Sequence, residues 1–459
     1  MKTKYIISII VITVGMMSCS EDFTDLAPTS QRNTNGFYNT SSDMVIATNA
    51  VYNALKENGC YNQSYWVLQE LRSDNTFWDG TGLAEEITVF DKFTDITTSN
   101  ITEDAWNDSY LGISRANIVI ERIDAIDMDA GLRSQLKGEA LFLRSLYYYH
   151  LTVAFGNIPL VLNETKSTDE GTEHVQVNAA TVYAQLITDL TSAESMLPQS
   201  YSGPDVGRAT KGAAATLLGK IYLTVGDNSN AESALRRVTG YGYSLVADYA
   251  DLWGVDNEHN AESIFEVEFE GGFGDQGNRF TSQFNNDLAA TVTAGLRNIP
   301  EQDLIDAYES GDARFAASVA GVEPDNTGWT IKYGLDNPFS EDDAPNNWVV
   351  FRYADVLLML AEAVGEGAEG YMLINQVRAR AGLASIDANS PGTFVEKLLQ
   401  ERRVELAFEN HRWADLLRFG VAESVMAEHG KPVNGKLLFA IPQRELDLNA
   451  SFEQNPGYE

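Results

Sequence analysis

The chain has 459 residues, a hydrophobic fraction of 44% and a formal net charge of −34 at pH 7. This hydrophobic content is typical of globular proteins, and the length allows two or three domains. So strong a negative charge argues against binding to nucleic acid and against direct adsorption to anionic lipid, because both present negative phosphates.

The N-terminus has the three-part pattern of a secretory signal. Lys2 and Lys4 precede an apolar run over residues 5–14, and small residues follow before Cys19. The run is too short and wrongly flanked for a stable transmembrane helix. Ser18–Cys19 resembles a lipobox, in which the signal is cut before a cysteine that then carries the lipid. Cys19 is therefore predicted to be lipidated; ordinary secretion with a cut nearby is the alternative.

The residues after Cys19 are polar and lack periodicity, so residues 19–40 are predicted to form an extended arm. A helix capped by Asp43 is predicted to run through Ala54, and a second helical stretch begins near Tyr65. Cys60, within the body of the chain, is most simply a small core residue, since one cysteine there provides no disulfide framework.

The loop after this second stretch concentrates aromatic, amide and carboxylate side chains. Its members are Asp74, Asn75, Phe77, Trp78 and Asp79. Such a combination suits sugars, which present apolar faces and many hydroxyls, so the loop is a candidate ligand contact. An equally open interpretation is that Trp78 is a buried anchor of the loop. The spacing of the acidic residues does not support a calcium loop.

The middle of the chain reads as paired helices. Two long helices are predicted between Asp104 and Ala154, and His150 on the second is interpreted as a satisfied core histidine. Helices at 181–197 and 208–225, followed by a shorter one, resemble degenerate tetratricopeptide units. Helix pairs of this kind cannot bury their faces singly, so they are expected to stack into a solenoid that serves as scaffold and partner-facing surface.

Residues 240–347 are richer in glycine, asparagine, aspartate and aromatics, with an alternating strand-like SIFEVEFE and plausible short hairpins. Trp329 and Trp348 stand in loop contexts; one could complete an aromatic platform while the other plugs the fold. The predicted fold class is mainly α. It is a tetratricopeptide-like helix-pair solenoid with an irregular, loop-rich ligand-facing side and minor β-hairpins.

A dense charged set is interleaved with the apolar helix faces between Phe351 and Phe419. Its members are Arg352, Asp355, Glu362, Arg378, Arg380, Glu401, Arg402, Arg403, Glu405, Glu409, Arg412, Asp415 and Arg418. Glu401, Glu405 and Glu409 are expected one helical turn apart. The set could be an acid–base site, but an architectural ion-pair network is favoured, because permanently charged arginine is a poor proton shuttle.

The same region contains RYADVLLMLAEA, NQVRARAG and ERRVELAFENHRWADLLRFG, which closely resemble the C-terminal signature of the SusD/RagB family. The Phe-Gly-x-x-Pro-Leu block ending at Leu160, Ile441-Pro442 and the closing residues 454–458 match the family too. Members are lipid-anchored nutrient-binding proteins of Bacteroidetes-type bacteria that sit over a TonB-dependent outer-membrane barrel.

The resemblance implies a signal peptide at 1–18 and a single SusD-like domain at 19–459. The arm would be 19–40, the helical scaffold 41–239 and 348–430, and the irregular segment 240–347. The resemblance also places part of the ligand site in the Asp74–Asp79 loop.

Common catalytic motifs are absent from the sequence: there is no H-E-x-x-H, no Cys/His metal spacing and no G-x-S-x-G. We therefore expect a non-enzymatic, surface-exposed outer-membrane lipoprotein with no cofactor or metal. It would bind an oligosaccharide and deliver it to a SusC-like transporter. A peptide-binding, RagB-like role is the main alternative, and a glycoside hydrolase, which needs only two carboxylates, is a more distant one. The candidate ligand contacts are Asp74, Asn75, Phe77, Trp78, Asp79, Trp329 and Trp348.

Overall fold

The computed structural model describes residues 37–78, 85–272, 276–285, 297–324, 326–334 and 342–458. The signal, Cys19 and Asp79 therefore lie outside the described residues. Among the helices described, none is long and apolar enough to cross a membrane.

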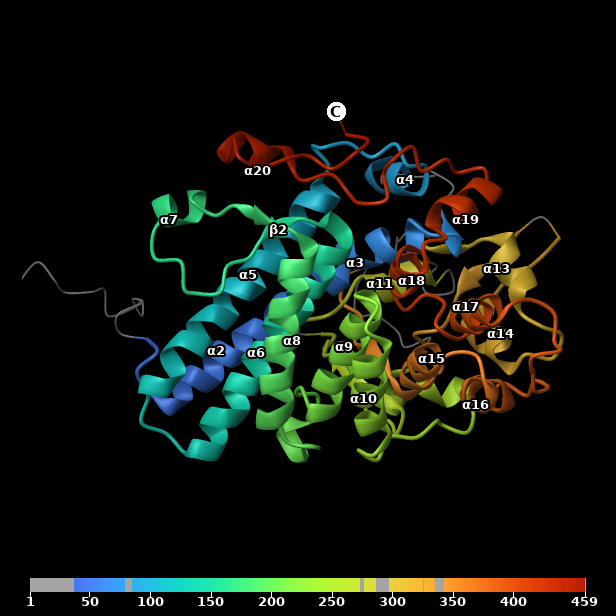
Figure 1. Cartoon of the computed structure of the whole chain (residues 1–459), viewed down its shortest axis with the longest axis horizontal. Helices are drawn as coiled ribbons and strands as arrows, with labels where there is room; N and C mark the ends of the chain where they lie inside the picture. The colour runs from blue at the N-terminus through green and yellow to red at the C-terminus, as the bar shows by residue number, and fades with distance from the viewer. Residues whose placement is uncertain are drawn as a thin grey trace, which may run out of the picture.

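The long helices pack one after another along the molecule, from the N-terminal helices at the left of Figure 1 to the C-terminal helices at the right. They are α2 (Ser41–Asn53), α5 (Asn100–Arg122), α6 (Ala130–Phe155), α8 (Ala179–Met196), α9 (Lys211–Thr224), α10 (Asn228–Thr239), α15 (Tyr353–Val364) and α16 (Ala368–Arg380). Each contacts the next in this order, with α10 leading into α15. The predicted mainly helical, stacked architecture is confirmed.

Helix starts follow from local side-chain chemistry. Thr40 is the N-cap of α2: its hydroxyl accepts from the backbone N–H of Asp43, and the Asp43 carboxylate accepts from the backbone N–H of Thr40. Asp43, predicted as the cap, is instead the third helical residue of this capping box. Thr210 caps α9 in the same way, by accepting from the backbone N–H of Ala213.

Small residues allow the long helices to approach one another closely. A Cβ added at Gly112 of α5 would lie 2.3 Å from the ring of Tyr147 on α6, so only glycine fits there. Tyr147 crosses this contact and donates its hydroxyl to the carbonyl of Val51, 2.7 Å away. Ala213, Ala214 and Ala215 are fully buried where α9 meets its neighbours, and their small side chains allow the close approach.

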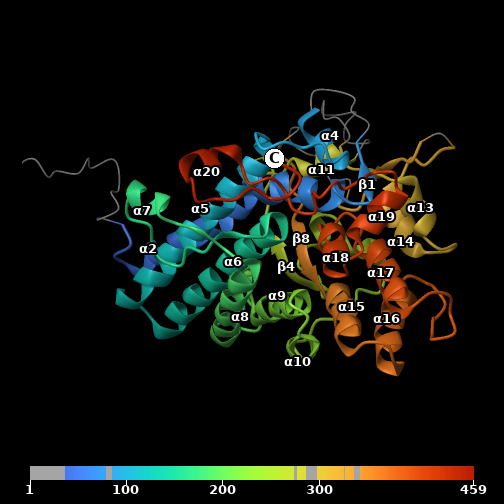
Figure 2. The same cartoon turned by 45° about the horizontal axis from the view of Figure 1, so that its top comes forward.

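Shorter helices fill the spaces around the solenoid. They are α3 (Ser64–Trp66), α4 (Glu85–Asp91), α7 (Thr168–Thr172), α11 (Phe280–Phe284), α13 (Gln302–Ala307), α14 (Ala313–Ser318), α17 (Phe394–Glu405), α18 (Arg412–Arg418), α19 (Ala422–Glu428) and α20 (Gln443–Leu448). Figure 2 shows α13, α14 and α16–α19 gathered at one end of the molecule.

Four antiparallel strand pairs occur in the described part of the chain. They are β1 (Thr76–Phe77) with β5 (Ile299–Pro300), β2 (Ile158–Pro159) with β3 (Gln176–Val177), β4 (Ser263–Val267) with β8 (Trp348–Arg352), and β6 (Val319–Ala320) with β7 (Trp329–Thr330). Two of them, β1–β5 and β4–β8, join strands far apart in sequence, so they are tertiary contacts rather than the expected hairpins.

The strand β8 carries Trp348 into an aromatic core. Its ring is fully buried, with centroids 4.7 Å from Phe280, 5.0 Å from Tyr333 and 6.2 Å from Phe284. Of Trp329 and Trp348, whose roles the sequence did not distinguish, Trp348 is thus the one that fills the core.

Candidate functional site

Two partly exposed aromatic residues, Phe77 and Trp329, lie on strands that contact β5. Strand β1 pairs with β5, with Phe77 opposite Ile299, and β5 contacts β7, which carries Trp329. The backbone N–H of Glu301 also donates to the carbonyl of Asn75 at 2.9 Å, which extends the pairing. We call these three strands the β1–β5–β7 edge; β1 is labelled in Figure 2.

The tryptophans at this edge differ in exposure. Trp78 is only 3% exposed, whereas Trp329 is partly exposed. The Trp329 ring lies against the backbone of Gly321, where an added Cβ would be 1.9 Å from the ring. Gly321 has a φ of 70°, a conformation that favours glycine, so both backbone and packing require that residue. The Trp329 ring is thus held in place by the Gly321 backbone. Trp78, by contrast, is too buried for a sugar to stack on its ring.

Asp74 and Asn75 are structural in this conformation, which differs from their expected role as ligand contacts. The Asp74 carboxylate accepts two 2.7 Å hydrogen bonds from Arg412 and lies 3.1 Å from Arg403. Burial opposes its ionisation, but Arg412 and Arg403 outweigh burial and hold the pKa of Asp74 below its usual range. Asn75 accepts from Arg403 at 3.0 Å. These arginines lie more than 300 positions away along the chain, so no local pattern could reveal the pairing.

A buried carboxyl group lies behind Asn75. Glu70 is fully buried and accepts hydrogen bonds from the Asn75 side chain at 3.2 Å and from the backbone N–H of Asn410 at 2.9 Å. Burial raises the pKa of Glu70 to about 7, more than these hydrogen bonds lower it. This is a pKa suited to acid–base chemistry, but the group has no exposed surface from which to reach a substrate.

Two buried amides lie beside the same edge. Gln283 at the end of α11 and Asn298 just before β5 are at most 1% exposed. The backbone N–H of Arg297 donates to the Gln283 carbonyl at 2.9 Å and joins the two segments. Neither side-chain amide has a hydrogen-bond partner among the described residues. Because a buried unpaired amide is costly, these groups are suited to bind ordered water inside the protein.

The charged set of the C-terminal helices forms the predicted ion-pair network. Arg352, at the end of β8, donates to Glu262 at 2.8 Å, to Glu409 at 2.7 Å and to Glu405. Arg380, at the end of α16, donates to Glu262 and Glu405 as well. Burial disfavours the Glu405 carboxylate, but Arg380, Arg352 and Arg314 outweigh burial and hold the pKa of Glu405 well below its usual value.

A second part of this network joins α15, α17 and α18. Arg402 donates to Asp415 at 2.7 Å and to Asp355 at 2.8 Å, and Arg418 donates to Glu362 at 2.9 Å. Burial opposes ionisation of Asp415, but Arg402 and Arg418 lower its pKa below the ordinary value. Carboxylates that stay ionised beside arginines do not exchange protons near neutral pH, which fits an architectural role.

The predicted helical spacing from Glu405 to Glu409 is wrong. Helix α17 ends at Glu405, and Phe408 and Asn410 adopt positive φ values of 68° and 64°. Glu409 therefore lies in a tight connection between α17 and α18, yet it still reaches Arg352. His150 fits its prediction as a core residue, because its Nε2 forms a 2.7 Å hydrogen bond with the Tyr61 hydroxyl and its ring stacks on Tyr65.

Among the described residues, two groups of three side chains have potential metal-ligand atoms within 4.8 Å of one another. In the first, Asp74 with Asp303 and His429, the guanidinium groups of Arg403 and Arg412 already neutralise Asp74. The second group is His259 with Glu266 and Glu268. Hydrogen bonding to Glu268 raises the pKa of His259 to about 9, so the imidazolium itself balances the two carboxylates in place of a metal ion.

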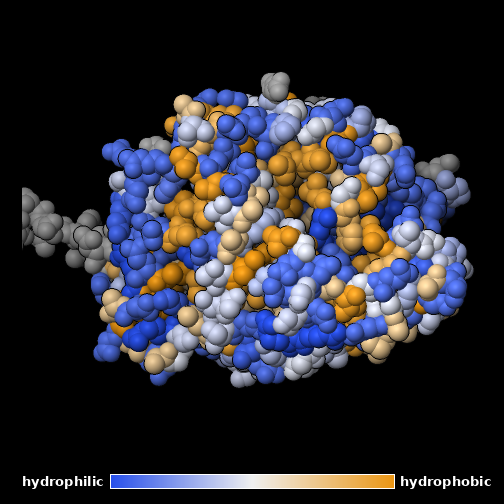
Figure 3. All heavy atoms as spheres, in the orientation of Figure 1, coloured by the Kyte–Doolittle hydropathy of each residue, from blue (hydrophilic) through white to orange (hydrophobic). Residues whose placement is uncertain are grey.

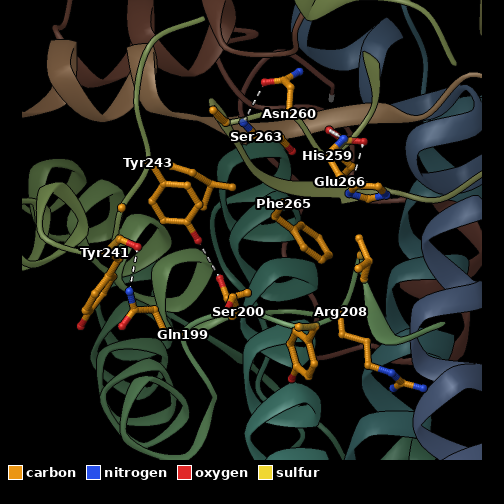
Figure 4. A pocket seen from close by; sticks show the side chains of 17 residues that line it. Gln199, Ser200, Arg208, Tyr241, Tyr243, His259, Asn260, Ser263, Phe265 and Glu266 are labelled. Carbon is orange, nitrogen blue, oxygen red and sulfur yellow. Dashed lines mark hydrogen bonds and ion pairs between the residues drawn. The ribbon is translucent and has the colours of Figure 1, made fainter. Parts of the chain in front are cut away.

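A cleft of about 260 Å³, which sequence reasoning missed, lies where the loops after α8 and α10 meet strand β4 (Figure 4). Tyr201, Tyr243 and Phe265 line it, together with His259. A neighbouring hollow of about 200 Å³ shares Val206, Gly207, Arg208 and Glu266 with it. We call the pair the double cleft. Its lining comes from separate loops, so no contiguous motif could have indicated it.

A larger apolar hollow, of about 550 Å³, lies between α6, α8, α18 and the C-terminal segment. Figure 3 shows hydrophobic side chains gathered in this part of the face. Its lining includes Tyr149, Tyr183, Leu417, Leu437 and Leu438. A hollow lined mainly by apolar side chains is a candidate contact for a partner protein.

Comparisons with known proteins agree with this architecture. Residues 22–223 match a family described as starch-binding and associating with the outer membrane, and residues 317–438 match the SusD family. The chain is 27% identical to a SusD-like protein of Formosa agariphila over 100% of both chains. It is 24% identical to the starch-binding protein SusD of Bacteroides thetaiotaomicron, over 76% of this chain and 77% of that protein.

Among solved structures, the protein resembles a laminarin-binding SusD-like protein with a TM-score of 0.82 and 30% sequence identity. The match covers 92% of this chain and 100% of the other. The signature around Arg352 and Glu405 lies within the segment that matches the SusD family. The chain therefore belongs to the SusD/RagB family, whose members are binding proteins rather than enzymes.

Proposed function

We propose that this protein is a cell-surface lipoprotein that binds an oligosaccharide and delivers it to a SusC-like TonB-dependent transporter. The observation that carries the proposal is the similarity along the whole of a laminarin-binding SusD-like protein, at 30% identity and a TM-score of 0.82. The starch-binding relative is more distant, at 24% identity, so laminarin oligosaccharides are the first ligands to test and maltooligosaccharides the second.

The β1–β5–β7 edge is the proposed ligand site. Phe77 and Trp329 provide partly exposed rings against which the C–H faces of a sugar can lose water. The charged groups nearby are paired with one another, so the edge favours a neutral, hydroxyl-rich ligand over a charged one.

Attachment and delivery are further parts of the proposal. The leader and Cys19 support anchoring by a lipid, and mass spectrometry of the mature N-terminus tests it; an unmodified N-terminus elsewhere would refute it. We expect the transporter to cover the apolar hollow of Figure 3. A Leu437→Asp variant should then lose co-purification with a TonB-dependent barrel in mild detergent while keeping its melting temperature.

Calorimetry on the purified protein tests the ligand class. The panel should contain laminarin oligosaccharides, maltooligosaccharides and short peptides. We expect micromolar affinity for an oligosaccharide, about −8 kcal/mol, because flexible glycans lose conformational freedom on binding. Binding of peptides alone would replace the proposal with a RagB-like role, and release of smaller sugars during the titration would indicate a hydrolase.

A further inference from the structure

The double cleft has the shape for an elongated ligand. The hollows of about 260 and 200 Å³ meet at Val206–Arg208, so a chain-like molecule can pass from one to the other. Gly207 lines both hollows at this junction and has a φ of 95°. A Cβ there would lie 2.6 Å from the Glu268 carboxylate, so a larger residue would displace Glu268, which lines the smaller hollow.

Partly exposed aromatic residues line the larger hollow. They are Tyr201 and Tyr243, the latter labelled in Figure 4, whereas the neighbouring Phe265 is buried. Tyr243 is held in place, because its hydroxyl is 3.0 Å from that of Thr210 and its ring lies against Gly212. Rings fixed in this way offer apolar faces at little cost in side-chain entropy.

The charged side chains around the double cleft are hydrogen-bonded within the protein, and Lys56 of the smaller hollow has a neutral partner, the Gln276 side-chain oxygen at 2.5 Å. Arg208 donates to Glu139 and Asp205, both at 2.9 Å, and to the side chain of Asn49 at 2.8 Å. Glu266 accepts from the backbone N–H of His259 at 3.1 Å and from the Asn347 amide at 3.0 Å. The double cleft therefore offers little to an anionic or cationic ligand.

Neutral hydrogen-bonding groups remain available. The hydroxyls of Ser200 and Ser263 line the larger hollow and make no side-chain hydrogen bond with the described residues. His259 lies 3.2 Å from Glu268 through Nε2, while its Nδ1 is 3.9 Å from Glu266, beyond hydrogen-bond distance. The hydrogen bond to Glu268 raises the pKa of His259 to about 9, so Nδ1 carries a proton at neutral pH and can donate a hydrogen bond to a ligand.

We propose that the double cleft is a second oligosaccharide-binding site, separate from the β1–β5–β7 edge. Aromatic rings, free hydroxyls, one N–H donor and internally hydrogen-bonded charges together suit a neutral sugar chain. This inference rests on the proposed function, since it assigns the same ligand class to another part of the surface. The two sites share no lining residue, so each can be blocked alone.

Ser200→Tyr blocks the larger hollow, and Ser202→Tyr is its matched control. Ser200 is exposed and lines the hollow, whereas Ser202 is exposed in the same loop and lines neither hollow. The probe is a laminarin hexasaccharide, and calorimetry gives the number of sites per chain. Circular dichroism and melting temperature should match the parent for both variants.

We expect two sites in the parent and in Ser202→Tyr, and one site in Ser200→Tyr. If the parent binds at a single site and Ser200→Tyr leaves that binding unchanged, the second site is overturned while the proposed function stands. If the parent binds at a single site that Ser200→Tyr abolishes and Trp329→Ala preserves, the result supports the double cleft and refutes the edge. Absence of binding by the parent to laminarin and maltose oligosaccharides alike would refute both proposals.

Discussion

The ion-pair network and the β1–β5–β7 edge use polar and aromatic residues in opposite ways. In the network, Arg402 and Asp355 have no exposed side-chain surface, and every charge described above has a partner within hydrogen-bond distance. At the edge, Phe77 and Trp329 leave part of their rings exposed. The densest charge in the sequence thus builds the scaffold, whereas less distinctive aromatic positions face outward.

Desolvation explains why the charges gather in one place. A buried guanidinium is tolerated only with acceptors, and a buried carboxylate stays ionised most readily beside an Arg, so the two kinds of group gather together. Arg352 illustrates this, because its guanidinium bonds to Glu262, Glu405 and Glu409. A family signature rich in Arg and Glu can therefore reflect an architecture rather than a chemical reaction.

The largest expected effect comes from breaking the network. Arg402→Ala leaves Asp355 and Asp415 without this guanidinium partner in a fully buried position. We expect a loss of about 3–5 kcal/mol in the free energy of unfolding, measured by urea denaturation. Affinity for the oligosaccharide should not change in the folded fraction. Loss of binding at unchanged stability would instead place a ligand site in the network.

Arg236→Ala is the matched control for that experiment. Arg236 also bridges two carboxylates, Glu232 at 2.7 Å and Glu369 at 2.9 Å, but its side chain is 44% exposed. Exposed pairs of this kind contribute about 0–1 kcal/mol. A similar loss for both variants would mean that burial does not explain the strength of the network.

The next effect is a loss of stability in mild acid. Burial, with Lys220 and His411 nearby, lowers the pKa of His150 to about 3. The unfolded chain, with an ordinary histidine pKa of about 6.5, binds this proton more readily than the native state. The contribution of neutral His150 to the free energy of unfolding is therefore fully present above about pH 6.5 and is lost as the pH falls toward 3. At pH 5 this loss amounts to about 2 kcal/mol.

His150→Gln tests this dependence, because glutamine can still form a hydrogen bond with the Tyr61 hydroxyl but does not titrate. The free energy of unfolding should change less between pH 7 and pH 5 in the variant than in the parent. Two other buried groups modify the parent curve: His411, with a pKa lowered by burial to about 3, adds to the acid loss, and Glu70 opposes it. Equal slopes in both proteins would contradict the assignment to His150.

The helices were predictable from the sequence to a greater extent than the site. The periodicity of α6 and the alanines of α9 are local patterns that packing then uses directly. The burial of Asp74 depends on Arg403 and Arg412, which come from the other end of the chain, and the sequence showed only its polarity. The double cleft is harder still, because it exists only once three loops meet.

Trp329→Ala should weaken oligosaccharide binding, by about 1–2 kcal/mol or roughly 5- to 30-fold, because one partly exposed ring is removed from the edge. Trp348→Phe is the contrasting variant, since Trp348 is fully buried among Phe280, Phe284 and Tyr333. It should lower the melting temperature and leave the affinity unchanged. The reverse result would move the ligand site from the β1–β5–β7 edge to the aromatic core.

The smallest expected effect is that of salt on ligand affinity. A neutral hexasaccharide carries no charge, so it forms no ion pair at either the edge or the double cleft. Its affinity should change by less than about twofold between about 50 and 500 mM salt, a range over which the Debye length falls severalfold. A cationic peptide would behave differently, because a chain with a net charge of −34 attracts it at long range at low salt. A steep loss of affinity with salt, measured by calorimetry across this range, would therefore favour a charged ligand and a peptide-binding role.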